Sequence, residues 1–456
     1  MYDVVIIGGG PGGYAAALYA HNFGLEVALV EKDILGGACL NRGCIPAKTW
    51  LHAADVFDTV RRAGDFGVVS SPPEINWQAA LARKNDVVDR LVRGVTGLLK
   101  SRDVKIFDGF GRLVEAGVAV DCADGTSIVL EARNVVVATG AVPRSIPGYD
   151  FDGTRIISSN EALDWTEQPE RVAIIGGGVI GCEFASLLSD FGSEVHVFEA
   201  LDQLLSGIDP DAVKVLARTF RKKKVAIRTG VAVDPPMITD AGIIVPFGAD
   251  SVEVDVVLVA VGRAPVVANM GLRAAGVKIE RGFIVADLAT MQTAVPNIYA
   301  VGDVVAGTPQ LAHAGFAEGI AAITHIATGD TQPVDYRAIP VVVYSHPEIA
   351  SVGLTQSEAE EAGYAVVASR HSMGGVGRAL IQDKTNGMTK VIAEDGGSIL
   401  GATIAGPAAG EMIHELMYAV AWESLPAEAA AYIHAHPTVA ESVGETLLAL
   451  AGRSLH

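Results

Sequence analysis

The sequence has few cysteines and few basic residues for its length, and both shortages exclude classes of protein. Only four of its 456 residues are cysteine: Cys39, Cys44, Cys122 and Cys182. A small secreted scaffold held by disulfides has more cysteines in a shorter chain, so this number favours the reducing cytoplasm. Lys and Arg total 34 against 53 Asp and Glu, which gives a net charge of −19. Such an acidic protein repels phosphate backbones and anionic lipid, so we expect no nucleic acid and no membrane among its partners.

A long uncharged stretch near the N-terminus lacks the composition of a membrane span. Residues 4–25 contain no Asp, Glu, Lys or Arg, and a stretch of this length can cross a bilayer as a helix. The stretch contains the sequence GGGPGG, however, and no basic residue precedes it. Consecutive glycine and proline disrupt the helix of a span or a signal peptide, so we expect no membrane insertion.

The chain is too long for a single hydrophobic core. At roughly 150 residues per domain, its length suggests about three domains. Half of the residues are apolar and 51 are glycine. This composition is typical of a large α/β protein with many tight turns between strands and helices.

The first thirty residues have the pattern of a strand, a glycine turn, a helix and a second strand. A β-branched run at 4–7 precedes the glycines, an alanine-rich stretch follows them, and a second apolar run at 27–30 ends in Glu31. The glycines have the spacing G-x-G-x-x-G: Gly8, Gly10 and Gly13. The first allows a tight turn, the second lets a pyrophosphate approach the backbone, and the third lets helix and strand pack closely. The pattern predicts a dinucleotide with its phosphates at the helix N-terminus and its ribose at Glu31.

The same pattern recurs in the middle of the chain. Its glycines have the same spacing: Gly176, Gly178 and Gly181. Glu199 follows Gly176 by 23 residues, as Glu31 follows Gly8. One glycine motif is weak evidence because such turns are common in α/β proteins, but two copies in register are strong evidence. We therefore predict a second dinucleotide-binding domain, with Glu199 at the ribose.

Three further apolar runs indicate how the domains are connected. Residues 134–141 and 255–265 each form an apolar strand that ends in a small-residue turn, and 297–304 form a strand with an acid at its end. The last strand follows the second motif but is not needed by it, so we expect the second domain to be inserted in the first. The predicted fold is α/β, with two Rossmann-like domains and a C-terminal α+β domain. The predicted boundaries are 1–147 and 271–335 for the first domain, 148–270 for the second, and 336–456 for the third.

Cys39 and Cys44 lie in the stretch GGACLNRGCIPAK, shortly after the first motif ends. Zinc sites usually have four ligands, and the chain has no second cysteine pair to complete one. A structural disulfide around this short loop is another alternative. The third is a redox couple, which a helix starting near Cys44 would favour by stabilising its thiolate. We favour the redox couple, because a flavin can pass two electrons between a disulfide and a nicotinamide, and two dinucleotide sites are predicted.

The doubled glycine motif, the C-x₄-C stretch and the C-terminal sequence HAHPTVAE resemble the pyridine nucleotide–disulfide oxidoreductases, and among them the dihydrolipoamide dehydrogenases. The resemblance runs along the whole chain. It implies that the first domain binds FAD and the second binds NAD, that Cys39 meets the substrate, and that Cys44 contacts the flavin. It also implies an ion pair of Lys48 with Glu183 beside the flavin ring. Further positions match cofactor contacts of the family: Thr139, Gly140, Asp303 and Ala312 for FAD, Gly262 and Arg263 on the nicotinamide side, and Val231 near the NAD adenine.

A histidine near the C-terminus completes the expected site. Oxidising a dithiol requires a base, and histidine is suited to this near neutral pH. Glu441 follows His436 by five residues and could hydrogen-bond its imidazole, which would fix the tautomer. A structural histidine would be the better interpretation without the cysteines, and it is the one we adopt for His434. The resemblance also implies a homodimer in which His436 of one subunit serves the cysteines of the other.

These features predict a cytoplasmic enzyme that contains FAD and no metal. It would oxidise dihydrolipoamide, free or on a lipoyl-bearing protein, through Cys39 and Cys44, and pass hydride to NAD⁺. Glu199 would repel the 2′-phosphate of NADP. Two alternatives stay open: a stand-alone NADH-dependent flavin reductase of another disulfide, and a flavin redox sensor without turnover.

Overall fold

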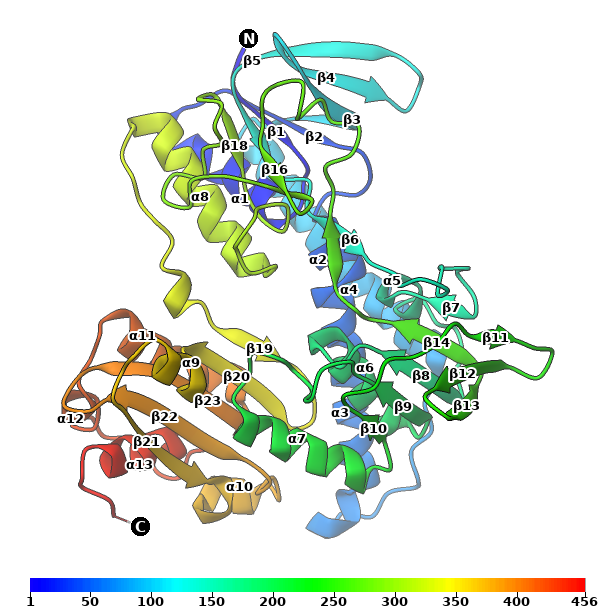
Figure 1. Ribbon diagram of the computed structural model, residues 1–456, viewed down its shortest axis with the longest axis vertical. Coiled ribbons are helices and arrows are strands. Elements are labelled where there is room, and N and C mark those ends of the chain that lie inside the picture. The colour runs from blue at the N-terminus through cyan, green and yellow to red at the C-terminus, as the bar shows by residue number, and fades with distance from the viewer. Residues whose placement is uncertain (456) are drawn as a thin grey trace. The chain divides into compact units, whose positions relative to one another are not determined.

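The computed structural model describes residues 1–455, and the chain divides into two compact units (Figure 1). Unit 1 comprises residues 1–50, 78–144 and 262–336. Unit 2 comprises residues 51–77, 145–261 and 337–456. Each unit is therefore assembled from segments that are distant in the sequence. None of the described helices is long and apolar enough to cross a membrane.

Unit 1 is built on a sheet whose parallel strands have the order β3-β2-β1-β5-β18. The outer halves of β3 and β5 pair antiparallel with β4. The strands are β1 (Tyr2–Ile7), β2 (Val27–Glu31), β3 (Lys105–Val114), β4 (Gly117–Cys122), β5 (Ser127–Val137) and β18 (Ile298–Ala300). Short pairs join β6 (Ala141–Pro143) to β15 (Arg263–Pro265) and β16 (Ile279–Glu280) to β17 (Phe283–Ile284). The helical elements are α1 (Pro11–Ala20), η1 (His21–Phe23), α2 (Gly37–Arg42), α3 (Cys44–Arg61), α4 (Trp77–Ser101), α8 (Ala312–Thr328) and η3 (Tyr336–Ala338), of which α3, α4 and η3 extend past the unit's boundaries.

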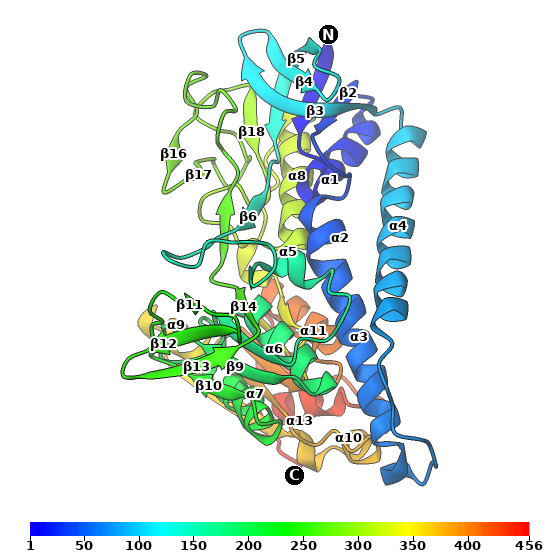
Figure 2. The same ribbon diagram turned by 90° about the vertical axis from the view of Figure 1, so that its right-hand side faces the viewer.

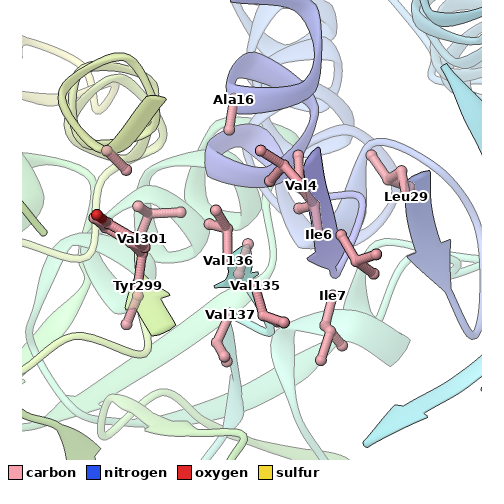
Figure 3. Close-up of a cluster of buried hydrophobic side chains, with 14 of the residues drawn as sticks. Val4, Ile6, Ile7, Ala16, Leu29, Val135, Val136, Val137, Tyr299 and Val301 are labelled. Carbon is pink, nitrogen blue, oxygen red and sulfur yellow. The ribbon is translucent and has the colours of Figure 1, made fainter. Parts of the chain in front are cut away.

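The core of unit 1 explains why its central strands are continuous apolar runs. Val4 and Ile6 on β1 and Val136 on β5 are fully buried, as expected for parallel strands covered on both faces. Ala16 of α1 and Val301 after β18 join the same cluster (Figure 3). The small residues of α1 let it pack closely against α8 (Figure 2).

Unit 2 contains a second parallel sheet with the order β10-β9-β8-β14-β7. Its strands are β7 (Ile156–Ile157), β8 (Arg171–Ile175), β9 (Glu194–Phe198), β10 (Ala226–Arg228) and β14 (Val256–Val259). The helices associated with it are α5 (Ser159–Ala162), α6 (Val179–Phe191) and α7 (Pro210–Lys222). An antiparallel sheet follows β10: β11 (Met237–Ile238), β12 (Ile243–Phe247) and β13 (Asp250–Val254). Helix α7 begins where Asp209 accepts a hydrogen bond from the Asp211 N–H and Pro210 occupies the first turn.

The C-terminal part of unit 2 is an antiparallel sheet with the order β19-β20-β23-β22-β21. Its strands are β19 (Val341–Val343), β20 (Glu348–Gly353), β21 (Val366–Ser372), β22 (Met388–Glu394) and β23 (Ile399–Gly406). Its helices are α9 (Gln356–Glu361), α10 (Gly377–Ile381), α11 (Ala409–Ala421), α12 (Pro426–Ala429) and α13 (Glu441–Leu450), with a short helical turn at η4 (Met373–Gly375). Another short turn, η2 (Ala63–Phe66), lies in the segment 51–77 of unit 2. Helix α11 packs on β20 and β23, whereas α13 packs on β21 and β22, and their buried residues form one core.

The fold class predicted from the sequence is confirmed. The run at 134–141 overlaps β5, which pairs with β1, and the run at 255–265 contains β14, which pairs with β8. Each run therefore closes the sheet of its own glycine motif. The predicted domain boundaries stay a prediction, because the compact units combine segments of more than one predicted domain.

Candidate active site

The first glycine motif forms the turn between β1 and α1. Gly8 has φ +106°, a left-handed conformation that glycine adopts without strain. A Cβ on Gly13 would lie 1.9 Å from the Gly8 carbonyl oxygen, so only glycine allows this close approach of helix and turn. Gly10 precedes the helix without a side-chain cap, and its nearest neighbour would be 3.8 Å from an added Cβ. Protein packing therefore explains Gly8 and Gly13, whereas Gly10 leaves open space at the helix N-terminus.

The second motif repeats this geometry between β8 and α6. Gly176 also has φ +106°, and a Cβ on Gly181 would lie 1.9 Å from the Gly176 carbonyl oxygen. A Cβ on Gly178 would meet no atom within 4 Å among the described residues. Both helices thus present uncapped N–H groups beside a vacant Cβ position. This arrangement fits the pyrophosphate of a dinucleotide, which needs amide donors and room near the backbone.

Glu31, the last residue of β2, and Glu199, the residue after β9, have matching hydrogen bonds. Glu31 accepts bonds from the Gly9 N–H at 2.7 Å and the Asp33 N–H at 2.9 Å. Glu199 accepts bonds from the Gly177 N–H at 2.6 Å and the Leu201 N–H at 2.8 Å. Each carboxylate is therefore fixed against its glycine turn. An ionised carboxylate accepts up to about four hydrogen bonds, so each can still accept from a ribose hydroxyl.

The cysteine pair lies at the junction of α2 and α3. Cys39 belongs to α2, and Cys44 is the first residue of α3. Both are free thiols and half-buried. A hydrogen bond to Cys44, together with burial, raises the pKa of Cys39, so Cys39 keeps its proton and donates it toward Cys44. Helix α3 begins at Cys44, as predicted from the sequence, and a helix N-terminus favours negative charge at this position.

Tyr14 is a neighbour of the two thiols that was not predicted from the sequence. Burial, followed by electrostatic interactions with Cys39 and Cys44, raises the pKa of Tyr14 to about 12. Its ring packs on Phe316 of α8, with ring centroids 5.6 Å apart. No local motif marks Tyr14, since only the fold brings α1 beside α2. Its position directly after the third glycine is the one signal that was available.

Another set of predicted site residues lies in unit 1 at the ends of β5, β15 and β18. The Thr139 hydroxyl donates to the Val266 carbonyl at 2.7 Å, and Arg263 Nε lies 3.8 Å from Asp303 Oδ2. Gly140 and Gly262 have φ of +66° and +111°, as the turns at these strand ends require. Burial raises the pKa of Asp303 and lowers that of Arg263, and each charge opposes the shift of the other.

Helix α8 begins at Ala312, a predicted FAD contact in the same unit. Its Glu318 is fully buried, accepts from the Gly302 N–H at 2.5 Å, and accepts from the Tyr336 hydroxyl at 3.1 Å. The hydrogen bond from Gly302 to Glu318 fixes the turn that precedes Asp303 against α8. Glu318 was not predicted from the sequence, because a glutamate inside a helix gives no sign that it is buried.

His436 and Glu441 form the expected pair in unit 2. His436 Nδ1 lies 2.7 Å from Glu441 Oε1, and Glu441 Oε2 accepts from the Thr438 N–H at 2.9 Å. The hydrogen bond from His436 is the largest of the effects that lower the pKa of Glu441. The imidazole is 78% exposed, so its Nε2 can reach a partner in solution. His434 lies on Glu415, with Nε2 2.5 Å from Oε1, which is consistent with its structural interpretation.

For three further predicted residues, the structure shows a position but no shared site. Lys48 belongs to unit 1 and Glu183 to unit 2, so their ion pair stays a prediction. Val231 donates its N–H to the Glu199 carbonyl at 3.0 Å and therefore lies at the end of β9. No group of three or more metal-ligating side chains occurs among the described residues.

Comparison with known proteins supplies the family. The pyridine nucleotide-disulphide oxidoreductase family matches residues 2–319, and the dimerisation domain of the same family matches residues 339–447. The chain belongs to this family. It is 37% identical to the dihydrolipoyl dehydrogenase of Bacillus subtilis, with 100% of this chain and 99% of that protein covered. It is 40% identical to the dihydrolipoyl dehydrogenase of Chlamydia muridarum, with 100% and 98% covered.

Solved structures of the family have the same fold. LpdA of Mycobacterium tuberculosis superposes with a TM-score of 0.92 at 28% identity, covering 99% of this chain and 100% of that one. The HOCl-induced flavoprotein disulfide reductase RclA of Escherichia coli, solved as a Cu(II) complex, gives a TM-score of 0.87 at 27% identity, with 98% of each chain covered. Membership of the family implies use of a flavin and a pyridine nucleotide, and the two glycine turns fit both.

Proposed function

We propose that this protein oxidises dihydrolipoamide to lipoamide and passes the electrons through FAD to NAD⁺. The dithiol at the junction of α2 and α3 carries this proposal, because Cys39 and Cys44 lie in the unit with the first glycine turn. The full-length similarity to dihydrolipoyl dehydrogenases of several organisms supports the choice of substrate. The family's dimerisation domain and the sparse cysteines support a cytoplasmic homodimer.

The cysteines perform the thiol chemistry. In the oxidised protein Cys39 and Cys44 form a disulfide, and a substrate thiolate attacks the Cys39 sulfur. Cys44 leaves as a thiolate, which the N-terminal end of α3 stabilises. The second substrate sulfur then attacks the first and displaces Cys39, so that lipoamide closes and the electron pair stays on the enzyme's dithiol. Bound FAD and NAD⁺ would accept this pair in turn, which is the chemistry that these cofactors supply.

His436 removes the protons from the substrate thiols. Glu441 holds Nδ1 of the ring, which leaves Nε2 as the acceptor. We infer that His436 removes these protons from a substrate bound at the cysteines of the partner subunit. Large apolar side chains are exposed in the segment matched by the dimerisation domain, which supports an interface there: Tyr418, Trp422, Leu425, Tyr432 and Ile433.

The similarity to RclA supports a second candidate, a stand-alone NADH-dependent reductase of another disulfide. Dihydrolipoamide and a panel of disulfides and dithiols should be assayed with NAD(H) and NADP(H). Dihydrolipoamide oxidation with NAD⁺ is expected to be the fastest reaction. Rapid reduction of a different disulfide, with lipoamide inactive, would replace the proposal by the second candidate. If the protein binds FAD but turns over no dithiol or disulfide, a flavin redox sensor would be the remaining interpretation.

A further inference from the structure

Helix α6 carries a stripe of buried polar residues on one face. Glu183, Ser186 and Asp190 are at most 5% exposed, and their spacing of three and four residues places them on the same side of the helix. The other buried positions of α6 are mainly apolar or small. A buried polar group destabilises the fold unless it is hydrogen-bonded. The stripe therefore requires partners.

One short loop of the C-terminal part supplies a partner to each member of the stripe. The loop joins β19 to β20, both in unit 2 with α6. The Tyr344 N–H donates to Glu183 Oε1 at 3.0 Å, and the His346 N–H donates to Ser186 Oγ at 2.9 Å. His346 Nδ1 lies 2.8 Å from Asp190 Oδ2 and donates to this carboxylate. His346 thus makes two of the three contacts.

The charges around His346 reinforce this arrangement. Asp190 also accepts from Lys223 Nζ at 2.5 Å, just after α7. On its other side, His346 Nε2 lies 3.8 Å from Asp55 Oδ1 of α3, and Lys384 Nζ lies 3.7 Å from the same oxygen. Arg61 donates to the Asp190 backbone carbonyl, and Glu348 interacts electrostatically with His346. His346 therefore links α6 to β19–β20 and faces α3.

The helix of the first glycine motif lacks this stripe. The residues of α1 that correspond to Glu183 and Ser186 are Ala15 and Leu18, and the third position lies beyond the end of α1. The turns themselves match closely, with the same φ at the first glycine and the same contact at the third. The polar stripe is therefore not a requirement of the glycine turn. It belongs to the helix that follows the second glycine turn.

We propose that His346 is a positioning residue for NAD(H): by holding Ser186 and Asp190 it fixes the register of α6, and so the placement of the helix N-terminus and of Glu183. The proposal rests on the proposed function, in which this helix binds NAD(H). A helix N-terminus binds phosphate through N–H groups whose directions are set by the helix axis. A change in its register misdirects these donors.

The test compares His346→Ala with two variants of graded severity. His346→Asn retains a donor near the position of Nδ1, and Ser186→Ala removes the acceptor of the His346 N–H alone. His21→Ala, at an exposed histidine of η1, is the matched control. The measurements are the Kd of ADP-ribose by calorimetry, and the KM for NADH and the kcat with an artificial electron acceptor.

For His346→Ala we expect the Kd of ADP-ribose and the KM for NADH to rise about tenfold, which is near the low end for leaving a buried group unpaired. The kcat at saturating NADH should stay within about threefold of wild type, and His346→Asn should recover most of the affinity. His21→Ala should match wild type.

A lower thermal midpoint with unchanged Kd and KM in His346→Ala would overturn the proposal, because the loop would then only stabilise the fold. If His346→Ala does not fold, unchanged nucleotide affinity in Ser186→Ala would overturn it equally. The proposed function is tested separately by the wild type: failure to oxidise dihydrolipoamide would refute that function, whereas the ratio of variant to wild-type ADP-ribose affinity would still report on His346.

Discussion

The two site cysteines have different surroundings although they are five residues apart. Cys39 lies inside α2 and keeps its proton through a hydrogen bond to Cys44. Cys44 begins α3, where the helix N-terminus favours a thiolate. Their roles in exchange should therefore separate in single variants. Sequence spacing predicted the pair and its helix, because both depend on local signals.

Cys44→Ser should retain FAD but lose dihydrolipoamide oxidation, because the exchange then has no leaving thiolate. NADH should give wild type a long-wavelength absorbance from a thiolate beside the flavin, and Cys44→Ser should lack it. Cys39→Ser should be inactive yet keep that absorbance. Cys122→Ser, on β4, serves as the control and should be fully active. Normal turnover by Cys44→Ser would show that the pair is not redox-active.

Glu199 should determine the choice of nicotinamide cofactor. Glu199→Ala removes the carboxylate that caps the second glycine turn and is expected at the ribose. We expect NAD⁺ use to weaken by about 1–3 kcal/mol, the range for stranding hydrogen-bonded groups. NADP⁺ use should improve in the same variant, because repulsion of the 2′-phosphate is relieved. The measurement is kcat/KM for both nucleotides, and a wild type that prefers NADPH would contradict the assignment.

Residues that act through the fold were harder to foresee than residues in motifs. His436 and Glu441 are five positions apart, and their hydrogen bond follows from the local chain. His346 and Asp190 are 156 residues apart, and no sequence pattern pairs them. Tyr14 likewise meets the thiols only because α1 and α2 fold together. Long-range contacts of this kind depend on tertiary structure and leave no periodic signal.

At the scale of elements, the glycine turns give a direct test of each dinucleotide site. In Gly181→Ala the new Cβ would lie 1.9 Å from the Gly176 oxygen and displace α6. We expect this variant to retain FAD but to be reduced poorly by NADH. Gly13→Ala should instead lose FAD, because its clash is with Gly8 in the other unit. These outcomes are read from bound-flavin absorbance and from flavin reduction by NADH.

Gly94→Ala is the matched control for both variants. Gly94 lies within α4, where an added Cβ would meet no atom within 4 Å among the described residues. Alanine is favoured over glycine in a helix by roughly 1 kcal/mol, so this variant should be at least as stable as wild type. Loss of FAD from Gly181→Ala, with NADH binding intact, would reverse the assignment of the two sites.

The ion pair of Asp190 on α6 with Lys223 should make the stability of the fold depend on pH. Burial raises the pKa of Asp190. The hydrogen bond from His346 and the charge of Lys223 lower this pKa by more than burial raises it, so the net shift is downward. A depressed folded-state pKa stabilises the fold above the unfolded value of about 3.9, and this stabilisation is lost as the pH falls through the folded value. Asp190→Asn should therefore lower the thermal midpoint at neutral pH, and its difference from wild type should narrow in acid.

Asp121→Asn is the control for this effect. Asp121 on β4 also has a lowered pKa, through hydrogen bonds from Ser127 and Arg112, but it is exposed and screened by solvent. Its substitution should change the midpoint little at any pH. A gap between Asp190→Asn and wild type that is equal at pH 7 and pH 3 would show that the Asp190 charge is not what stabilises the fold.

Strong periodic or β-branched runs predicted the central strands, and the α+β character of the C-terminal part followed from its mixed runs. Helix α4 was not predicted, although its apolar residues Val88, Leu91 and Val95 recur at the spacing of an amphipathic helix. The small sheet β11–β13 was not predicted. Short strands of two to five residues carry too few positions for a period of two to be evident.

At the scale of the whole molecule, the chain brings distant segments into each unit. Unit 1 joins residues on both sides of the second glycine motif, as predicted for an inserted domain. The proposed base lies in unit 2 and the cysteines in unit 1. The exposed imidazole and the family's dimerisation domain support a site shared between subunits. From the sequence, a shared site is predicted only by the resemblance to the family. No pattern within one chain indicates which subunit's site a side chain joins.

Complementation between two inactive variants distinguishes a shared site from a site within one chain. Cys44→Ser and His436→Ala homodimers should each be nearly inactive. When they are unfolded and refolded together, random pairing makes about half of the dimers mixed, and each mixed dimer has one site with both lesions and one intact site. About a quarter of wild-type activity should therefore return. Refolding Cys44→Ser with the double variant Cys44→Ser/His436→Ala is the control and should return none. If His436 served its own chain, every site of the first mixture would carry one lesion, so mixed dimers without recovered activity would refute the shared site while leaving the disulfide chemistry intact.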